Sequence, residues 1–106
     1  MAQVTLTDAQ NNATVQAHVG DTITLALPEN PTTGYQWSVQ QNNTTVLAVT
    51  NDEYASESQR PGSGGTHTFV FEAIASGASA LDLVNARSWE PASAANQRYS
   101  VTIQVH

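Results

Sequence analysis

The chain of 106 residues contains no cysteine and no lysine, and only 11% of its residues are charged. Without cysteine it forms no disulfide and offers neither a thiolate nucleophile nor a zinc–thiolate site. The net charge of −6 leaves no basic patch of the kind that nucleic acids and anionic membranes require, so we expect neither as a partner. No apolar run approaches the roughly 18 residues of a membrane-spanning helix, and we expect no signal peptide in this sequence.

What the chain does contain is a repeated alternation of apolar and polar residues with a period of two. This period is typical of strands that bury one face, and the turn-forming residues between the segments favour antiparallel pairing. A chain of this length buries enough surface to fold without a disulfide. We therefore predict a single domain over residues 1–106, an immunoglobulin-like antiparallel β-sandwich of seven or eight strands. The clearest strand segments are residues 4–7, 15–19, 23–27, 36–39, 69–73, 81–83 and 99–105.

One connection has an unusual composition, Asn30-Pro31-Thr32-Thr33-Gly34, and leads into Tyr35-Gln36-Trp37. Pro31 fixes its own φ near −65°, and the two β-branched threonines have few side-chain rotamers to lose. Gly34 accepts a positive φ and lets the chain reverse. These features predict a stiff, uncharged, protruding loop suited to insertion into the cleft of another molecule. The alternative is an ordinary turn between strands.

Two further connections stand out. Arg60-Pro61-Gly62-Ser63-Gly64-Gly65 is almost bare backbone, which lets a partner approach its N–H and C=O groups; a flexible hairpin loop is the alternative. Arg87-Ser88-Trp89-Glu90-Pro91 places a large aromatic side chain between two charges. An exposed tryptophan in such a setting is a common interface anchor, and the alternative is a buried tryptophan that caps the sandwich.

The three segments together resemble the signature loops of the chagasin-like inhibitors of cysteine peptidases. The matching motifs are Asn30-Pro31-Thr32-Thr33-Gly34-Tyr35-x-Trp37, Gly62-x-Gly64-Gly65 and Arg87-x-Trp89, in the same order and at similar separations. The resemblance extends from about Val4 to Val105. The chain departs from the pattern at Ser88, where the family usually has proline, so the third loop is expected to be less rigid.

The resemblance implies a reversible, competitive, tight-binding inhibitor of papain-like cysteine peptidases, and not an enzyme. The first loop, with Thr32 and Thr33 foremost, would cover the catalytic cysteine and histidine of the peptidase. Gly62, Ser63, Gly64 and Gly65 would bind along one side of the cleft through backbone hydrogen bonds. Trp89, positioned by Arg87, would pack on the other side. No cofactor is implied.

The remaining candidates have simpler interpretations. His18, His67 and His106 lie on separate strands or at the terminus, so we expect no metal site. Asn51-Asp52-Glu53 and Glu57 are interpreted as a solvated acidic loop, since no cation-binding loop pattern surrounds them. Trp37 is expected in the core, with Tyr35 supporting the base of the first loop.

Another class of function stays open from the residues alone. A carbohydrate-binding or adhesion module would also be an acidic sandwich rich in asparagine and threonine, with Tyr35, Tyr54 and Trp89 as stacking platforms. It would leave the first loop without a purpose. We expect a monomer, and the missing lysine favours a periplasmic or secreted location.

Overall fold

The computed structural model describes residues 2–29, 35–56, 65–87 and 97–106. Within these ranges the chain forms eight strands and one short 3-10 helix, η1 (Asp8–Gln10). The strands are β1 (Gln3–Leu6), β2 (Ala13–Ala17), β3 (Thr22–Glu29), β4 (Tyr35–Gln41), β5 (Leu47–Ser56), β6 (Gly65–Ala73), β7 (Gly77–Arg87) and β8 (Gln97–Val105).

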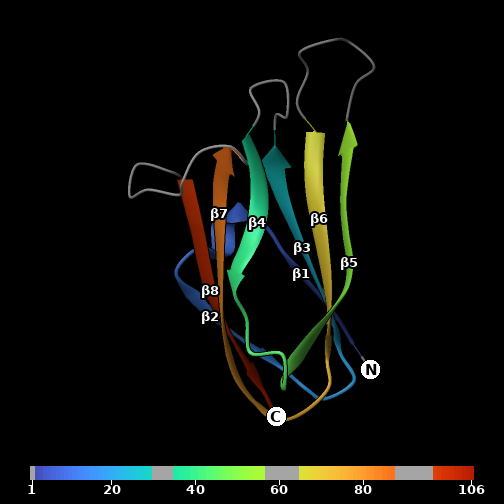
Figure 1. The fold of residues 1–106 in the computed structure, drawn as a ribbon. Helices are drawn as coiled ribbons and strands as arrows, with labels where there is room; N and C mark the ends of the chain where they lie inside the picture. Colours follow the sequence, from blue (N-terminus) through green and yellow to red (C-terminus); the bar gives the residue numbers. More distant parts are fainter. Residues whose placement is uncertain (1, 30–34, 57–64, 88–96) are drawn as a thin grey trace.

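The strands form two four-stranded sheets that pack face to face (Figure 1). The first sheet has the order β1-β3-β6-β5, and the second has the order β2-β8-β7-β4. This confirms the predicted immunoglobulin-like β-sandwich, and the described residues contribute eight strands to it. Most neighbouring strands are antiparallel, but β1 pairs with β3 in parallel, and β2 pairs with β8 in parallel. Each sheet is therefore mixed.

The parallel pairs arise because the N-terminal segment changes sheets at η1. The side chain of Thr7 accepts a hydrogen bond from the backbone of η1, and the side chain of Gln10 accepts one from the backbone N–H of Thr7. This reciprocal cap redirects the chain, and Asn12 then takes a positive φ of 66°. Instead of forming a hairpin with each other, β1 and β2 belong to different sheets. Residue alternation reveals neither strand's partner.

The core lies between the inner faces of the two sheets. Alternate residues of β3 and β6 are buried against alternate residues of β7 and β8, as the period of two predicts. The largest of these fully buried side chains are Phe69, Phe71, Ile23, Leu25, Leu27, Leu81, Leu83, Tyr99 and Ile103. Val19 does not belong to this set, since β2 ends at Ala17 and Val19 is 51% exposed in the following turn.

The interpretation of Asn51-Asp52-Glu53 as a solvated loop is wrong. These residues lie in the middle of β5, which pairs with β6 along its whole length. The strand was missed because the register shifts between Val49 and Asn51, which interrupts the alternation of inner and outer residues. β5 is also an edge strand, and edge strands tolerate polar and charged residues. Among the described residues, no helix is long and apolar enough to span a bilayer.

Candidate functional site

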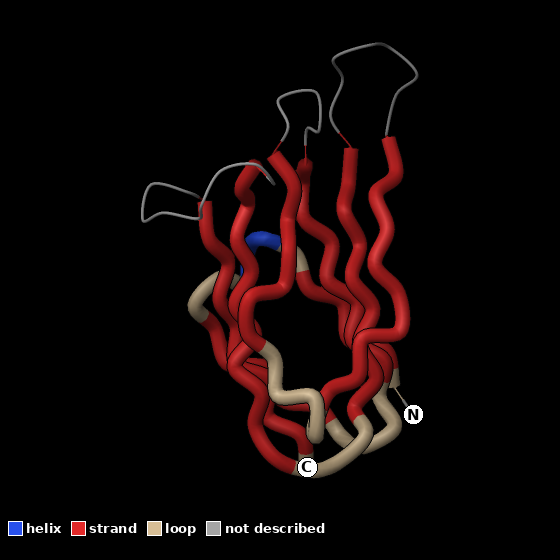
Figure 2. Tube along the Cα trace, viewed as in Figure 1, coloured by secondary structure: helices blue, strands red, loops and turns tan. Residues whose placement is uncertain are grey.

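The strand ends that flank the three predicted loops all lie at one end of the sandwich (Figures 1 and 2). In the first sheet, Glu29 at the end of β3 pairs with Gly65 at the start of β6, and Gly65 also pairs with Ser56 at the end of β5. The strand ends that flank the connections 30–34 and 57–64 are therefore neighbours in the first sheet.

The second sheet places the third connection at the same end. Tyr35, the first residue of β4, pairs with Arg87, the last residue of β7. Gln97, the first residue of β8, pairs with Asn85, which lies close to Arg87 on the same strand, β7. The two motif residues Tyr35 and Arg87 are thus cross-strand neighbours, which couples the backbone at the base of the first connection to that of the third.

Three of the predicted site residues lie within the described part of the chain. Gly65 is buried, and its backbone pairs with strands on both sides, while Tyr35 and Arg87 are placed by their strand register. The other predicted site residues lie outside the described residues. These are Asn30, Pro31, Thr32, Thr33, Gly34, Gly62, Ser63, Gly64 and Trp89.

Beneath the first connection, a buried carboxylate joins the two sheets. The Glu29 side chain is only 1% exposed, and its Oε1 accepts a hydrogen bond of 2.6 Å from the backbone N–H of Trp37. β4 is the edge strand of its sheet, so an N–H that faces away from β7 finds no neighbouring strand. The Glu29 carboxylate satisfies that donor, and it thereby ties the end of β3 to the start of β4.

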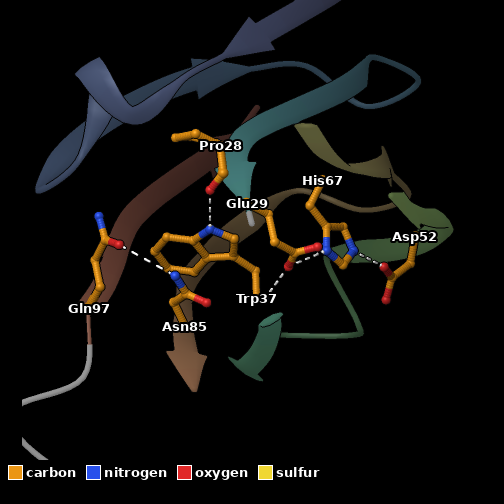
Figure 3. A network of polar contacts seen from close by, with 7 residues as sticks. All are labelled: Pro28, Glu29, Trp37, Asp52, His67, Asn85 and Gln97. Carbon is orange, nitrogen blue, oxygen red and sulfur yellow. Dashed lines mark hydrogen bonds and ion pairs between the residues drawn. The ribbon is translucent and has the colours of Figure 1, made fainter. Parts of the chain in front are cut away.

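The indole of Trp37 makes a second connection between the same strands. Trp37 is 4% exposed, which confirms its predicted place in the core, and its Nε1–H donates to the carbonyl oxygen of Pro28 at 2.8 Å. The pairing of β1 with β3 stops at Leu25, so at Pro28 the missing proline N–H costs β3 no bond to β1. Both bonds link the end of β3 to the start of β4 (Figure 3).

His67 lies on the other side of Glu29, between two carboxylates. Its Nδ1 is 2.9 Å from Oε1 of Glu29, its Nε2 contacts Oδ1 of Asp52, and its ring stacks on Phe69 with centroids 4.3 Å apart. Burial disfavours the charged ring, but the hydrogen bonds with Asp52 and Glu29 outweigh it and raise the pKa of His67 above its ordinary value of 6.5. We call Glu29, His67 and Asp52 the carboxylate–histidine cluster.

Sequence reasoning missed this cluster, although a signal for it exists. The inward row of β3 is Ile23, Leu25, Leu27 and then Glu29, and the inward row of β6 begins with Gly65 and His67 before Phe69. Continuing the alternation by one more step would have placed an acid and a histidine at buried positions of paired strands. A buried charge must be paired, so these two residues could have been matched.

Among the described residues, no group of three or more histidine, cysteine, aspartate or glutamate side chains is arranged to hold a metal ion. His18 and His106 do approach each other at the opposite end of the sandwich, with ring centroids 5.9 Å apart, but the Asp21 carboxylate beside them is occupied by backbone N–H groups.

A rigid sandwich that gathers three connections at one end, above a base closed by buried polar bonds, is a binding module. Residues 16–103 match the model of the chagasin family, "Chagasin family peptidase inhibitor I42". The chain belongs to this family of cysteine peptidase inhibitors and is not an enzyme.

Individual relatives agree with this assignment. The chain is 31% identical to Chagasin of Trypanosoma cruzi, over 95% of this chain and 96% of that protein. It is also 31% identical to Amoebiasin-1 of Entamoeba histolytica, over 83% of this chain and 86% of the relative. The crystal structure of a cysteine protease inhibitor from Entamoeba histolytica shares the fold, with a TM-score of 0.89, 23% identity, and coverage of 100% of this chain and 97% of that one.

The family membership also decides against a carbohydrate-binding or adhesion module. Of the three aromatic residues on which that alternative rests, Tyr54 lies within β5 and is half-buried, so it offers no open stacking platform. Trp89 and the side chain of Tyr35 lie outside the described residues.

Proposed function

We propose that this protein inhibits papain-like cysteine peptidases reversibly and competitively, by placing three loops in the active-site cleft. The binding residues are Asn30, Pro31, Thr32, Thr33, Gly34 and Tyr35 of the first loop, Gly62, Ser63, Gly64 and Gly65 of the second, and Arg87 and Trp89 of the third. The observation that carries this proposal is the gathering of the three motif-bearing connections at one end of the sandwich.

The first loop is suited to the catalytic centre because its residues are small and uncharged. The cysteine and histidine of a papain-like peptidase form a thiolate–imidazolium pair. Thr32 and Thr33 cover this pair without burying an additional charge, whose desolvation would oppose binding. No bond of the inhibitor needs to break, so the inhibition is occlusion of the cleft.

The second and third loops supply the flanks of the interface. The glycines of residues 62–65 allow an extended peptidase segment to approach the backbone and form hydrogen bonds with it. Trp89 provides the largest apolar side chain of the three loops, and Arg87 orients it from the end of β7.

The bonds beneath the first loop favour tight binding. Glu29 and Trp37 fix the two strands from which the loop leaves, so less conformational entropy is lost when the loop enters the cleft. A preorganised wedge binds more tightly than a mobile loop of the same composition.

Titration of active papain with the purified protein tests the proposal. We expect complete, reversible inhibition with an inhibition constant in the nanomolar range or below, and competition with substrate. Trypsin and thermolysin serve as controls and should retain full activity. Mass spectrometry after prolonged incubation should show the intact chain. Full papain activity at micromolar inhibitor would contradict the proposal.

A further inference from the structure

Each ring nitrogen of His67 faces a carboxylate oxygen. Nδ1 faces Oε1 of Glu29 at 2.9 Å, and Nε2 faces Oδ1 of Asp52 (Figure 3). An ionised carboxylate only accepts hydrogen bonds, and a neutral imidazole carries a single N–H. Both contacts can therefore be satisfied together only when His67 is protonated.

The two carboxylates differ in what happens when His67 loses its proton. The side chain of Asp52 is 55% exposed, so it can turn towards water. The side chain of Glu29 is 1% exposed and has no such route. In the described part of the chain, the imidazolium of His67 is the cation that contacts Glu29. Deprotonation thus leaves a buried carboxylate without its counter-charge, which is strongly unfavourable.

Glu29 transmits this change to the first loop. The same oxygen, Oε1, accepts the hydrogen bonds from His67 and from the backbone N–H of Trp37. Glu29 is the last residue of β3, and Trp37 is the third residue of β4. A displaced or protonated Glu29 carboxylate weakens the bond that holds together the two strands flanking residues 30–34.

We propose that the carboxylate–histidine cluster is a proton-dependent latch, which positions the first binding loop and makes inhibition tighter in acidic than in alkaline solution. The proposal rests on the proposed function for the consequence at the peptidase, but the latch itself is a property of the free protein. Glu29 and His67 act as positioning residues, because neither belongs to the loops that enter the cleft.

The surroundings of His67 set the direction of the effect. The described titratable groups around His67 are Glu29 from β3, and Asp52 and Tyr54 from β5. Tyr54 is the cross-strand partner of His67. On β6, His67 stacks on the uncharged Phe69. Because the pKa of His67 is raised in the folded protein, its stabilising contribution is complete below pH 6.5 and is lost as the pH rises through the folded value.

Nuclear magnetic resonance of the free protein tests the latch without a peptidase. The carbon-bound ring protons of His67 report its titration, and the backbone amide of Trp37 reports the bond to Glu29. We expect the Trp37 amide shift to follow the His67 titration curve over about pH 5.5 to about pH 8.5, where histidines change charge. A Trp37 amide that stays constant while His67 titrates would overturn the proposal.

Inhibition constants for papain over the same pH range test the consequence. His67→Asn places a neutral amide donor where Nδ1 lies, so it keeps a bond to Glu29 but cannot titrate. The ratio of wild-type to His67→Asn inhibition constants removes the pH dependence of papain itself. We expect this ratio to rise about tenfold from acidic to alkaline pH.

A second pair of variants keeps the test decisive where His67→Asn folds poorly. Asp52→Asn removes the exposed negative partner of His67, whereas Glu53→Gln removes an equal charge from the neighbouring exposed residue of β5. We expect Asp52→Asn to move the midpoint of the pH profile to lower pH, and Glu53→Gln to leave it in place. Equal shifts in the two variants would reduce the effect to net charge and overturn the latch.

The outcomes separate the two proposals. A wild-type protein that inhibits papain at no pH contradicts the proposed function, and with it the effect of the latch on inhibition. A wild-type protein that inhibits papain with a pH profile identical to that of His67→Asn contradicts the latch alone.

Discussion

The carboxylate of Glu29 accepts the backbone N–H of Trp37 at 2.6 Å, and this bond joins one sheet of the sandwich to the other. The two residues are eight positions apart in sequence and enclose the connection 30–34. The loop that bears the most specific motif of the chain is therefore tied at both ends by a buried charge. A bond of this kind strengthens in the low dielectric of the interior, and its loss leaves costly unpaired groups.

The first prediction concerns this bond. Glu29→Ala leaves the Trp37 N–H and the His67 ring without their buried partner, and we expect it to lower the free energy of unfolding by about 3 kcal/mol. Glu29→Gln keeps an acceptor and should lose less. Urea unfolding near pH 6 measures both. Glu72→Ala, at an exposed position of β6, is the matched control. A Glu29→Ala variant as stable as Glu72→Ala would show that the bond contributes nothing.

The second prediction concerns Tyr99, whose hydroxyl donates to the carbonyl oxygen of Thr7 at 2.7 Å. Burial first, and the nearby charge of Asp8 second, raise the pKa of Tyr99 to about 12. Tyr99→Phe keeps the ring in the core and removes one hydrogen bond, so we expect a loss of about 1 kcal/mol in stability. The denaturant dependence should stay unchanged. Wild-type stability in Tyr99→Phe would mean that water replaces the hydroxyl at no cost.

The third prediction concerns stability in acid. The buried carboxylate of Asp21 accepts the backbone N–H of Ala2 and that of His18, each at 2.9 Å, and these bonds hold its pKa below the ordinary value of 3.8. A lowered pKa contributes stability that is present above pH 3.8 and disappears as the pH falls through the folded value. Asp21→Asn should therefore flatten the stability profile in this acidic range. Thermal unfolding at a series of pH values measures it, and parallel profiles for the two proteins would contradict the assignment.

The sequence predicts the sandwich well where one face of a strand is uniformly apolar. β3, β6 and β8 are predicted correctly, because a run of alternate residues in each strand is apolar and these residues are buried. β5 does not, because its bulge shifts the register and its edge position tolerates an acidic run. The parallel pairing of β1 and β2 depends on strands distant in sequence, and local pattern carries no information about it.

For the site, the motifs predict the loops but not what holds them. The three connections were identified from their own residues, and the fold places their flanking strands together. For the carboxylate–histidine cluster, the alternation marks Glu29 and His67 as buried positions, but the complete cluster could not be assembled from sequence. Its members lie on three different strands, and Asp52 was assigned to a loop, so the pairing of His67 with both acids appears only once β3, β6 and β5 are aligned.

The fourth prediction concerns the third loop. Trp89→Ala removes the largest apolar side chain of the three loops, and we expect binding to papain to weaken roughly ten- to a hundredfold. Ser88→Pro restores the residue usual in the family and should tighten binding slightly by restricting the free loop. Ser88→Ala is the control, because it removes the hydroxyl without adding the ring. Equal inhibition constants for Ser88→Pro and Ser88→Ala would mean that rigidity at this position is unimportant.

The inhibition constant of Thr33→Asp for papain tests the central claim most directly. If the first loop covers the catalytic cysteine and histidine, the new carboxylate must be buried without a partner, and binding should weaken by about a hundredfold or more. Thr44→Asp is the matched control, since it adds the same charge to an exposed threonine in the turn between β4 and β5, at the opposite end of the sandwich. The account predicts wild-type inhibition for Thr44→Asp and severe loss for Thr33→Asp. Equal inhibition by the two variants would show that the first loop does not occupy the catalytic centre.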